Sequence, residues 1–194
     1  MTDDLVDVYE RTVRATGRRV AAVRPEQLHD PTPCTEWDVL ALLDHMVGGL
    51  LAYGMIAVDG RIDFRRIHAA DLAARYVDVY EEAAAGAIAS WRRPGVLEEP
   101  CRHPLGPMRR GDALALHHAD HLLHGWDLCV ATGQDAALDE PAAELAFRAL
   151  TSVTPVTDAL RAGGYWGAEG AVAPGSGISD RLLAFSGRVP PARR

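Results

Sequence analysis

Apolar residues recur every three to four positions over most of the chain, which is the spacing of amphipathic helices. This pattern predicts four long helices, over residues 3–23, 35–58, 69–92 and 110–131. Thr35 is a suitable N-cap for the second of them. Strict alternation of apolar and polar residues, which marks a half-buried strand, forms no run of any length. Four long helices with connections of moderate length predict an all-α four-helix bundle.

The segments between and after these helices are rich in proline and glycine. They predict a loop over 95–109, a short helix over 139–151, a glycine-rich loop over 163–177 and a last short helix over 179–185. A short extended piece is expected near Val96 in the first loop. Gly133 is placed to end the fourth long helix, and Asp139 to cap the helix that follows it.

Composition narrows the function classes. The chain has 194 residues and a net charge of -7, and its 20 basic residues are all arginine. The acidic balance argues against a nucleic-acid-binding protein, which would present a basic face, and against electrostatic attachment to anionic lipid. Without lysine, the chain has no Schiff-base nucleophile and no lysine general base.

Cysteine usage and the N-terminus bear on the compartment. Cys34, Cys101 and Cys129 match no CxxC or zinc-ribbon spacing, and the acidic N-terminus does not resemble a signal peptide. No apolar run is expected to approach the roughly 20 residues of a membrane span. These features predict a cytoplasmic protein with no membrane partner.

Histidine is the informative residue type. Four of the eight histidines fall within 117–124, where Asp120 also lies. At about 100° per residue, His117, His121 and His124 share one stripe of the predicted helix, and Asp120 lies one turn before His124. Neutral imidazole and carboxylate suit zinc, nickel, iron or manganese. Two ligands are not a complete site, so a solvated or hydrogen-bonded polar face is the alternative interpretation.

A third ligand is available on the second predicted helix. His45 lies within an apolar run, with Gly48 and Gly49 one turn further along. Small residues next to an imidazole leave space beside it. Each glycine inside a helix costs up to about 1 kcal/mol relative to alanine, so either a pocket or close helix packing must offset that cost.

Several other side chains carry weaker signals. Cys34 precedes the second helix, whose N-terminus can activate a thiol, although a small buried turn residue is the simpler interpretation. Asp127 can bond an arginine or orient a ligand histidine. Four aromatic residues fit either core packing or the wall of a pocket: Trp37, Trp126, Tyr53 and Tyr76.

Five segments resemble blocks of the DinB/YfiT-like metalloprotein superfamily: 31–38, 43–45, 105–108, 120–133 and 180–188. Within that superfamily, the chain is most similar to the actinobacterial branch that includes the metal-binding domain of mycothiol-dependent maleylpyruvate isomerase. The resemblance covers most of the chain.

The resemblance implies a four-helix bundle that holds one divalent metal through His45, Asp120 and His124, with His117 and His121 as the alternative ligands. The family more often has histidine or glutamate at position 120, so the shorter aspartate predicts a shifted or weaker site. Three protein ligands leave an open position, as in catalytic sites. Zinc is the expected metal, nickel the alternative, and mycothiol the expected co-substrate.

The leading functional hypothesis is a metal-dependent transferase or isomerase that activates a thiol against an electrophilic small molecule. The alternatives are a non-catalytic metal- or ligand-binding bundle, with a homodimer as one assembly, and a metal-independent enzyme with His117 or His121 as general base. We expect one domain over 1–194, with a bundle core over 3–133 and a C-terminal extension over 134–194. That length leaves no room for the second domain that the family's isomerase carries.

Overall fold

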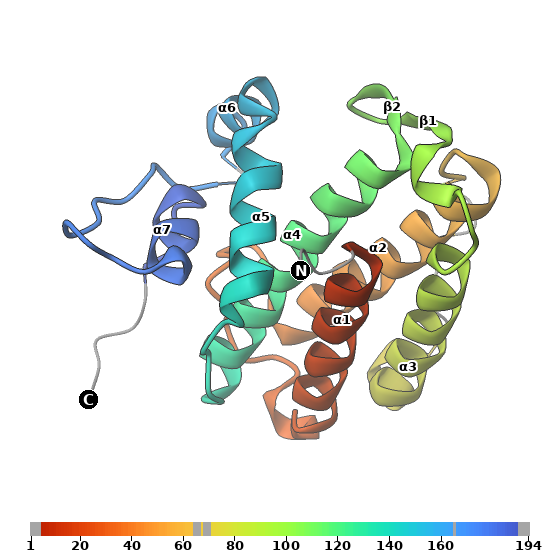
Figure 1. Cartoon of the computed structure of the whole chain (residues 1–194). Coiled ribbons are helices and arrows are strands. Elements are labelled where there is room, and N and C mark those ends of the chain that lie inside the picture. Colours follow the sequence, from red (N-terminus) through yellow and green to blue (C-terminus); the bar gives the residue numbers. More distant parts are fainter. Residues whose placement is uncertain (1–4, 64–66, 68–70, 165, 190–194) are drawn as a thin grey trace.

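The computed structural model describes residues 5–63, 67, 71–164 and 166–189 and shows a mostly helical protein (Figure 1). Within the described residues the α-helices are α1 (Leu5–Ala21), α2 (Val39–Asp59), α3 (Leu72–Trp91), α4 (Arg110–Thr132), α5 (Glu140–Thr151), α6 (Thr154–Ala162) and α7 (Ile178–Phe185). An antiparallel hairpin of β1 (Pro100–His103) and β2 (Gly106–Arg109) joins α3 to α4. The all-α prediction is confirmed, and the hairpin is a small addition to it.

Helix α4 lies between two apolar cores. On one side α1, α2 and α3 pack with it around a core that includes Leu43 and Leu114. On the other side α5 and α7 pack around a core that includes Leu123 and Leu182 (Figure 1). Burial on both sides explains why nearly every residue of the middle of α4 is buried, including its histidines and Asp127.

Helix α2 begins later than predicted. Its N-cap is Asp38, whose Oδ1 accepts a hydrogen bond from the Ala41 N–H at 2.8 Å, so the prediction of Thr35 as the cap is wrong. The turn before it is closed by Thr32, whose hydroxyl donates to the Trp37 carbonyl at 2.8 Å. Asp38 is itself a strong N-cap residue, and it stands at the point where the chain leaves this turn.

Two other predicted helix caps, Gly133 and Asp139, are confirmed. Gly133 ends α4 in the left-handed conformation, with φ of 71°, as expected. Asp139 caps α5 and accepts from the Ala142 N–H at 3.1 Å. Residues 69 and 70, where the third helix was expected to start, lie outside the described residues.

The prediction of a loop over 95–109 is wrong for the hairpin. Each strand has only four residues, and they include Pro100 and Pro107, which obscure any alternating pattern. The piece near Val96 that was expected to be extended is a 3-10 turn, Val96–Glu98.

The hairpin is attached to the C-terminal end of α2. The Arg102 N–H donates to the Gly60 carbonyl at 2.7 Å. Arg110, at the start of α4, donates from Nη1 to the Ala57 carbonyl at 2.7 Å and pairs with Glu99 at 2.8 Å. Because Arg110 is buried, these bonds hold α2, α4 and the hairpin in a fixed relation.

The C-terminal part folds back on α4. Helix α6 was not predicted, since it has only nine residues, includes Pro155 and follows α5 after a short turn. The chain over 166–177 has no regular structure, and Gly170 N–H donates to the Ala184 carbonyl of α7 at 2.9 Å. This return path brings Arg188, just after α7, to the surface of α4.

Helix α2 is more apolar over its length than was expected of any segment of the chain. At 21 residues it is long and apolar enough to cross a bilayer, by length and composition alone. Half of its most apolar segment is buried inside the protein. The prediction that no apolar run approaches the length of a span is therefore wrong, although one such helix is weak evidence for a membrane segment.

Candidate metal centre

Two histidines and one aspartate meet where α2 packs on α4. His45 Nε2 lies 3.3 Å from Asp120 Oδ2, and His124 Nε2 lies 3.4 Å from Asp120 Oδ1. One candidate ligand atom from each side chain lies within 4.8 Å of the other two. The structure thus brings together the three residues that the resemblance implies. The site stays open to solvent, because 36% of the His45 side chain and 44% of the Asp120 side chain are exposed.

The cluster has the electrostatics of a carboxylate facing protonated imidazole. Burial raises the pKa of Asp120, but its charge interactions and hydrogen bonds with His124 and His45 outweigh burial and hold it well below its usual range. Burial lowers the pKa of His124, but Asp120 and Asp127 outweigh it and raise it well above the usual value. A divalent cation would take the place of the imidazole proton, so metal binding here would release a proton.

Asp127 fixes His124 from the opposite side. This fully buried carboxylate accepts a hydrogen bond from His124 Nδ1 at 2.9 Å. It also accepts two from Arg188, from Nε at 2.9 Å and from Nη2 at 2.6 Å. Burial raises the pKa of Asp127, but these two cations lower it below its usual value. Because Nδ1 is committed to Asp127, the Nε2 atom of His124 is the one that faces Asp120.

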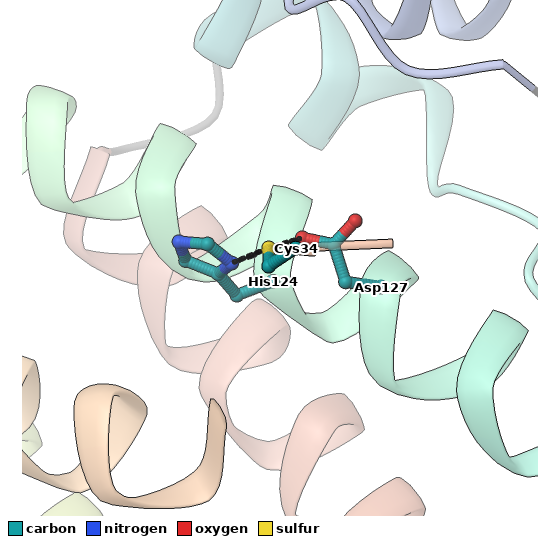
Figure 2. Close-up of side chains that lie close together, drawn as sticks. All are labelled: Cys34, His124 and Asp127. Atoms are coloured by element: carbon teal, nitrogen blue, oxygen red, sulfur yellow. Dashed lines mark hydrogen bonds and ion pairs between the residues drawn. The ribbon is translucent and has the colours of Figure 1, made fainter. Parts of the chain in front are cut away.

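Cys34 lies beside this pair, as Figure 2 shows. Its Sγ donates to Asp127 Oδ2 at 3.4 Å and lies 3.9 Å from His124 Nδ1. By distance alone, Cys34, His124 and Asp127 form a second group that could hold a metal. Arg188 already neutralises Asp127 with two hydrogen bonds, so a second cation at that carboxylate is disfavoured. The geometry favours the group around Asp120.

The other histidines of α4 lie in the interior. The His118 Nε2 is 3.1 Å from the Thr12 hydroxyl oxygen, and the His121 Nε2 is 2.7 Å from the Tyr80 hydroxyl oxygen. Burial lowers the pKa of His118 to about 3 and that of His121 well below its usual value. Both imidazoles are therefore neutral at physiological pH.

His117 differs from these two because neither of its ring nitrogens has a hydrogen-bond partner among the described residues. Burial lowers the pKa of His117 to about 4. Its ring stacks on Tyr53 with a centroid distance of 4.2 Å, and its Nε2 would lie 3.0 Å from a Cβ built on Gly49. Glycine at position 49 thus permits the close approach of His117 to α2.

The aromatic candidates separate into two groups. Trp37 lies against the cluster, with ring centroids 4.7 Å from His45 and 5.6 Å from His124. Trp126 and Tyr76 are buried in the two cores, and the Tyr76 hydroxyl donates to a backbone carbonyl at 2.7 Å. Trp37 therefore forms a wall of the site, whereas the other two are packing residues.

Two residues near the site were not identified from the sequence. Arg188 stands in a segment that resembles the family, but nothing in the sequence pairs it with Asp127, 61 residues away. His103 lies on β1 and contacts the Tyr53 hydroxyl at 2.8 Å. It left no signal because the hairpin that carries it was not predicted.

Comparison with known proteins identifies relatives in sequence and in fold. No protein-family model matches the chain. An uncharacterised protein of Mycobacterium tuberculosis, known from strains CDC 1551 / Oshkosh and ATCC 25618 / H37Rv, is 33% identical over 136 residues. The match covers 70% of this chain and 71% of that protein. A mutant of mycothiol-dependent maleylpyruvate isomerase has a similar fold, with a TM-score of 0.56 and 11% identity over 75% of this chain and 67% of the isomerase chain.

Proposed function

The chain belongs to the family of the uncharacterised Mycobacterium tuberculosis protein, and on that premise we propose that it is a divalent-metal-dependent enzyme. The observation that carries the proposal is the meeting of His45, Asp120 and His124 at a partly exposed position between α2 and α4. Two imidazoles and one carboxylate are a donor set that zinc accepts readily, with nickel as the alternative.

The residues around the cluster support a metal-binding role for His124. Ligand histidines commonly donate their second ring N–H to a carboxylate, which fixes the ring and increases its basicity. Asp127 takes this position, and Arg188 holds Asp127 in turn. Because Asp127 is fully buried, solvent does not compete for these bonds.

We propose a thiol of the mycothiol type as co-substrate and an electrophilic small molecule as its partner, in a transfer or isomerisation reaction. The likeness in fold to a mycothiol-dependent isomerase supports this choice. When bound, a divalent metal would lower the pKa of a thiol or polarise a carbonyl. The chain itself would supply Trp37 as an apolar wall and leave the exposed side of Asp120 for entry.

The two alternatives differ in their support. A general base at His117 or His121 gains nothing from the geometry, since both imidazoles are buried and His121 is bonded to Tyr80. A non-catalytic metal-binding protein shares the same three ligands. It is separated from the enzyme by activity alone.

Metal analysis tests the first step. We expect one zinc per wild-type chain by mass spectrometry of the intact protein and by elemental analysis, and its loss in His45→Ala and His124→Ala. His29→Ala is the matched control, because His29 is an exposed histidine bonded to Asp38. A wild-type protein without stoichiometric metal, and with both variants unchanged, would refute the proposal.

Activity tests the second step. Zinc-loaded protein should accelerate adduct formation between mycothiol and 1-chloro-2,4-dinitrobenzene, and metal-stripped protein should not. Equal rates with and without metal would favour the metal-independent enzyme. Bound zinc without any acceleration across several electrophiles would favour the non-catalytic protein.

A further inference from the structure

Tyr53 follows the candidate ligand His45 by about two turns on α2, and both side chains contact α4. Its ring stacks almost flat on His117 of α4, with an interplanar angle of 6°. His117 in turn lies one turn before Asp120. Tyr53 is partly exposed, unlike the core tyrosines Tyr9 and Tyr80. Its side chain is therefore reached by solvent, and it lies close enough to Asp120 for the charge of that carboxylate to act on it.

The hydrogen bonds of His103 determine the direction of the bond to Tyr53. The Leu105 N–H donates to His103 Nδ1 at 3.1 Å, so that nitrogen is an acceptor. Burial lowers the pKa of His103, which keeps the ring neutral. A neutral imidazole with an accepting Nδ1 carries its proton on Nε2, and Nε2 lies 2.8 Å from the Tyr53 hydroxyl. His103 therefore donates, and the Tyr53 oxygen accepts.

This assignment leaves the Tyr53 proton uncommitted. No second partner for the hydroxyl is found among the described residues. Burial, followed by the charge of Asp120, raises the pKa of Tyr53, so the phenol stays protonated. The group is thus a hydrogen-bond donor that still lacks an acceptor.

The support of this donor is rigid. The strand that carries His103 is bonded to the end of α2 through Arg102 and Gly60, at 2.7 Å. Arg110 bonds the same helix end from α4. Helix α2 therefore holds Tyr53 from one side, while the hairpin holds its hydroxyl from the other.

We propose that Tyr53 donates a hydrogen bond to an acceptor oxygen, a carbonyl or carboxylate, of the small molecule bound beside His45, Asp120 and His124. His103 is the positioning residue that aims this donor. The inference rests on the proposed metal-dependent function. The hydrogen bond from Tyr53 would make the proposed site selective: ligands with an acceptor oxygen are preferred over ligands that offer only nitrogen to the metal.

Two probes test this selectivity on cobalt-loaded full-length protein, whose visible absorption reports ligand binding. Acetohydroxamate offers acceptor oxygens, whereas imidazole binds a metal through nitrogen and offers none. Tyr53→Phe should weaken acetohydroxamate binding by about three- to tenfold, the value of one neutral hydrogen bond, and leave imidazole binding unchanged. His103→Leu should have the same selective effect, and His103→Gln, which keeps an N–H donor, a smaller one.

Tyr76→Phe is the matched control, since that hydroxyl bonds a backbone carbonyl in the core, and it should leave both affinities at the wild-type value. Equal losses for both probes in Tyr53→Phe would mean a structural role and overturn the inference. Metal binding with unchanged acetohydroxamate affinity in Tyr53→Phe would overturn the inference alone. Failure of the wild-type protein to bind metal would overturn the proposed function, and the inference with it.

Discussion

Helix α4 places histidines in two contrasting environments within two turns. Towards α2, His124 lies between two carboxylates that raise its pKa. Towards α1 and α3, His118 and His121 lie among buried side chains, and burial lowers their pKa values. The same residue type on one helix therefore serves opposite purposes. The neighbouring carboxylates, rather than the density of histidines, mark the candidate metal site.

The largest effect on stability is expected from replacing Asp127, the carboxylate that bonds His124. Asp127→Asn leaves the Arg188 guanidinium, with 9% of its side chain exposed, without a charged partner. Breaking a buried pair in this way costs about 3–5 kcal/mol of the free energy of unfolding, which urea denaturation would measure. Adding Arg188→Gln should recover part of the loss. Asp158→Asn, at an exposed pair, is the control. A loss below about 1 kcal/mol would contradict the account.

Metal affinity separates the two environments directly. His124→Ala should lower zinc affinity by more than about 100-fold, because loss of an outer partner alone costs about 10–100-fold. His118→Ala, which removes a buried histidine of the same helix, should leave zinc affinity unchanged while lowering stability. Competition with a fluorescent zinc chelator would measure both. Equal losses of zinc affinity in the two variants would mean that His124 and His118 do not differ in their relation to the metal.

Stability of the metal-free protein should fall on both sides of about pH 6.5. The pKa of His118 is about 3 in the folded protein and lies near 6.5 when unfolded. The unfolded chain therefore binds more protons between these values, and stability falls as the pH decreases from 6.5. The raised pKa of His124 has the opposite effect, since its contribution is lost as the pH rises from 6.5 through its folded value.

Single variants show which histidine causes the fall in stability below about pH 6.5 (the acid limb) and which causes the fall above it (the alkaline limb). His118→Gln should reduce the slope of stability against pH in the acid limb, by up to about 1.4 kcal/mol per pH unit. His124→Gln should reduce the slope in the alkaline limb. Urea denaturation at a series of pH values would measure both. An acid limb that is unchanged in His118→Gln would show that this histidine is already protonated in the folded protein.

The smallest expected effect concerns Cys34. Its sulfur is 3.4 Å from Asp127, but Arg188 bonds the same carboxylate twice and more closely. Cys34→Ser should therefore change zinc affinity by less than about twofold, a difference that chelator competition resolves. Loss of zinc in this variant would instead assign the metal to Cys34, His124 and Asp127.

The sequence predicted the parts of the fold that depend on local pattern. The long helices follow from apolar spacing, and the caps Gly133 and Asp139 from residues with a strong positional preference. The N-cap of α2 was placed three residues too early, because Thr35 and Asp38 are both good caps and only the turn between them decides. The hairpin was missed because strands of four residues with prolines carry no pattern.

The candidate site shows the same limit. The spacing of Asp120 and His124 on one helix predicted that they would meet, and the structure places them 3.4 Å apart. His45 came from the resemblance, because no pattern says which helix faces α4. The helical stripe also joined His117 and His121 to His124, although His117 stacks on Tyr53 of α2, His121 bonds Tyr80 of α3, and neither belongs to the group around Asp120. The position of Arg188 next to Asp127 depends on how the C-terminal segment folds back on α4, which the sequence did not predict.

We propose that His45, Asp120 and His124 hold the metal. X-ray absorption at the zinc edge of the zinc-loaded wild-type protein tests it most directly. We expect two imidazoles and oxygen ligands at about 2.0–2.2 Å and no sulfur. A zinc–sulfur shell at about 2.3 Å would place the metal at Cys34 instead, and a protein that takes up no zinc would contradict the claim altogether.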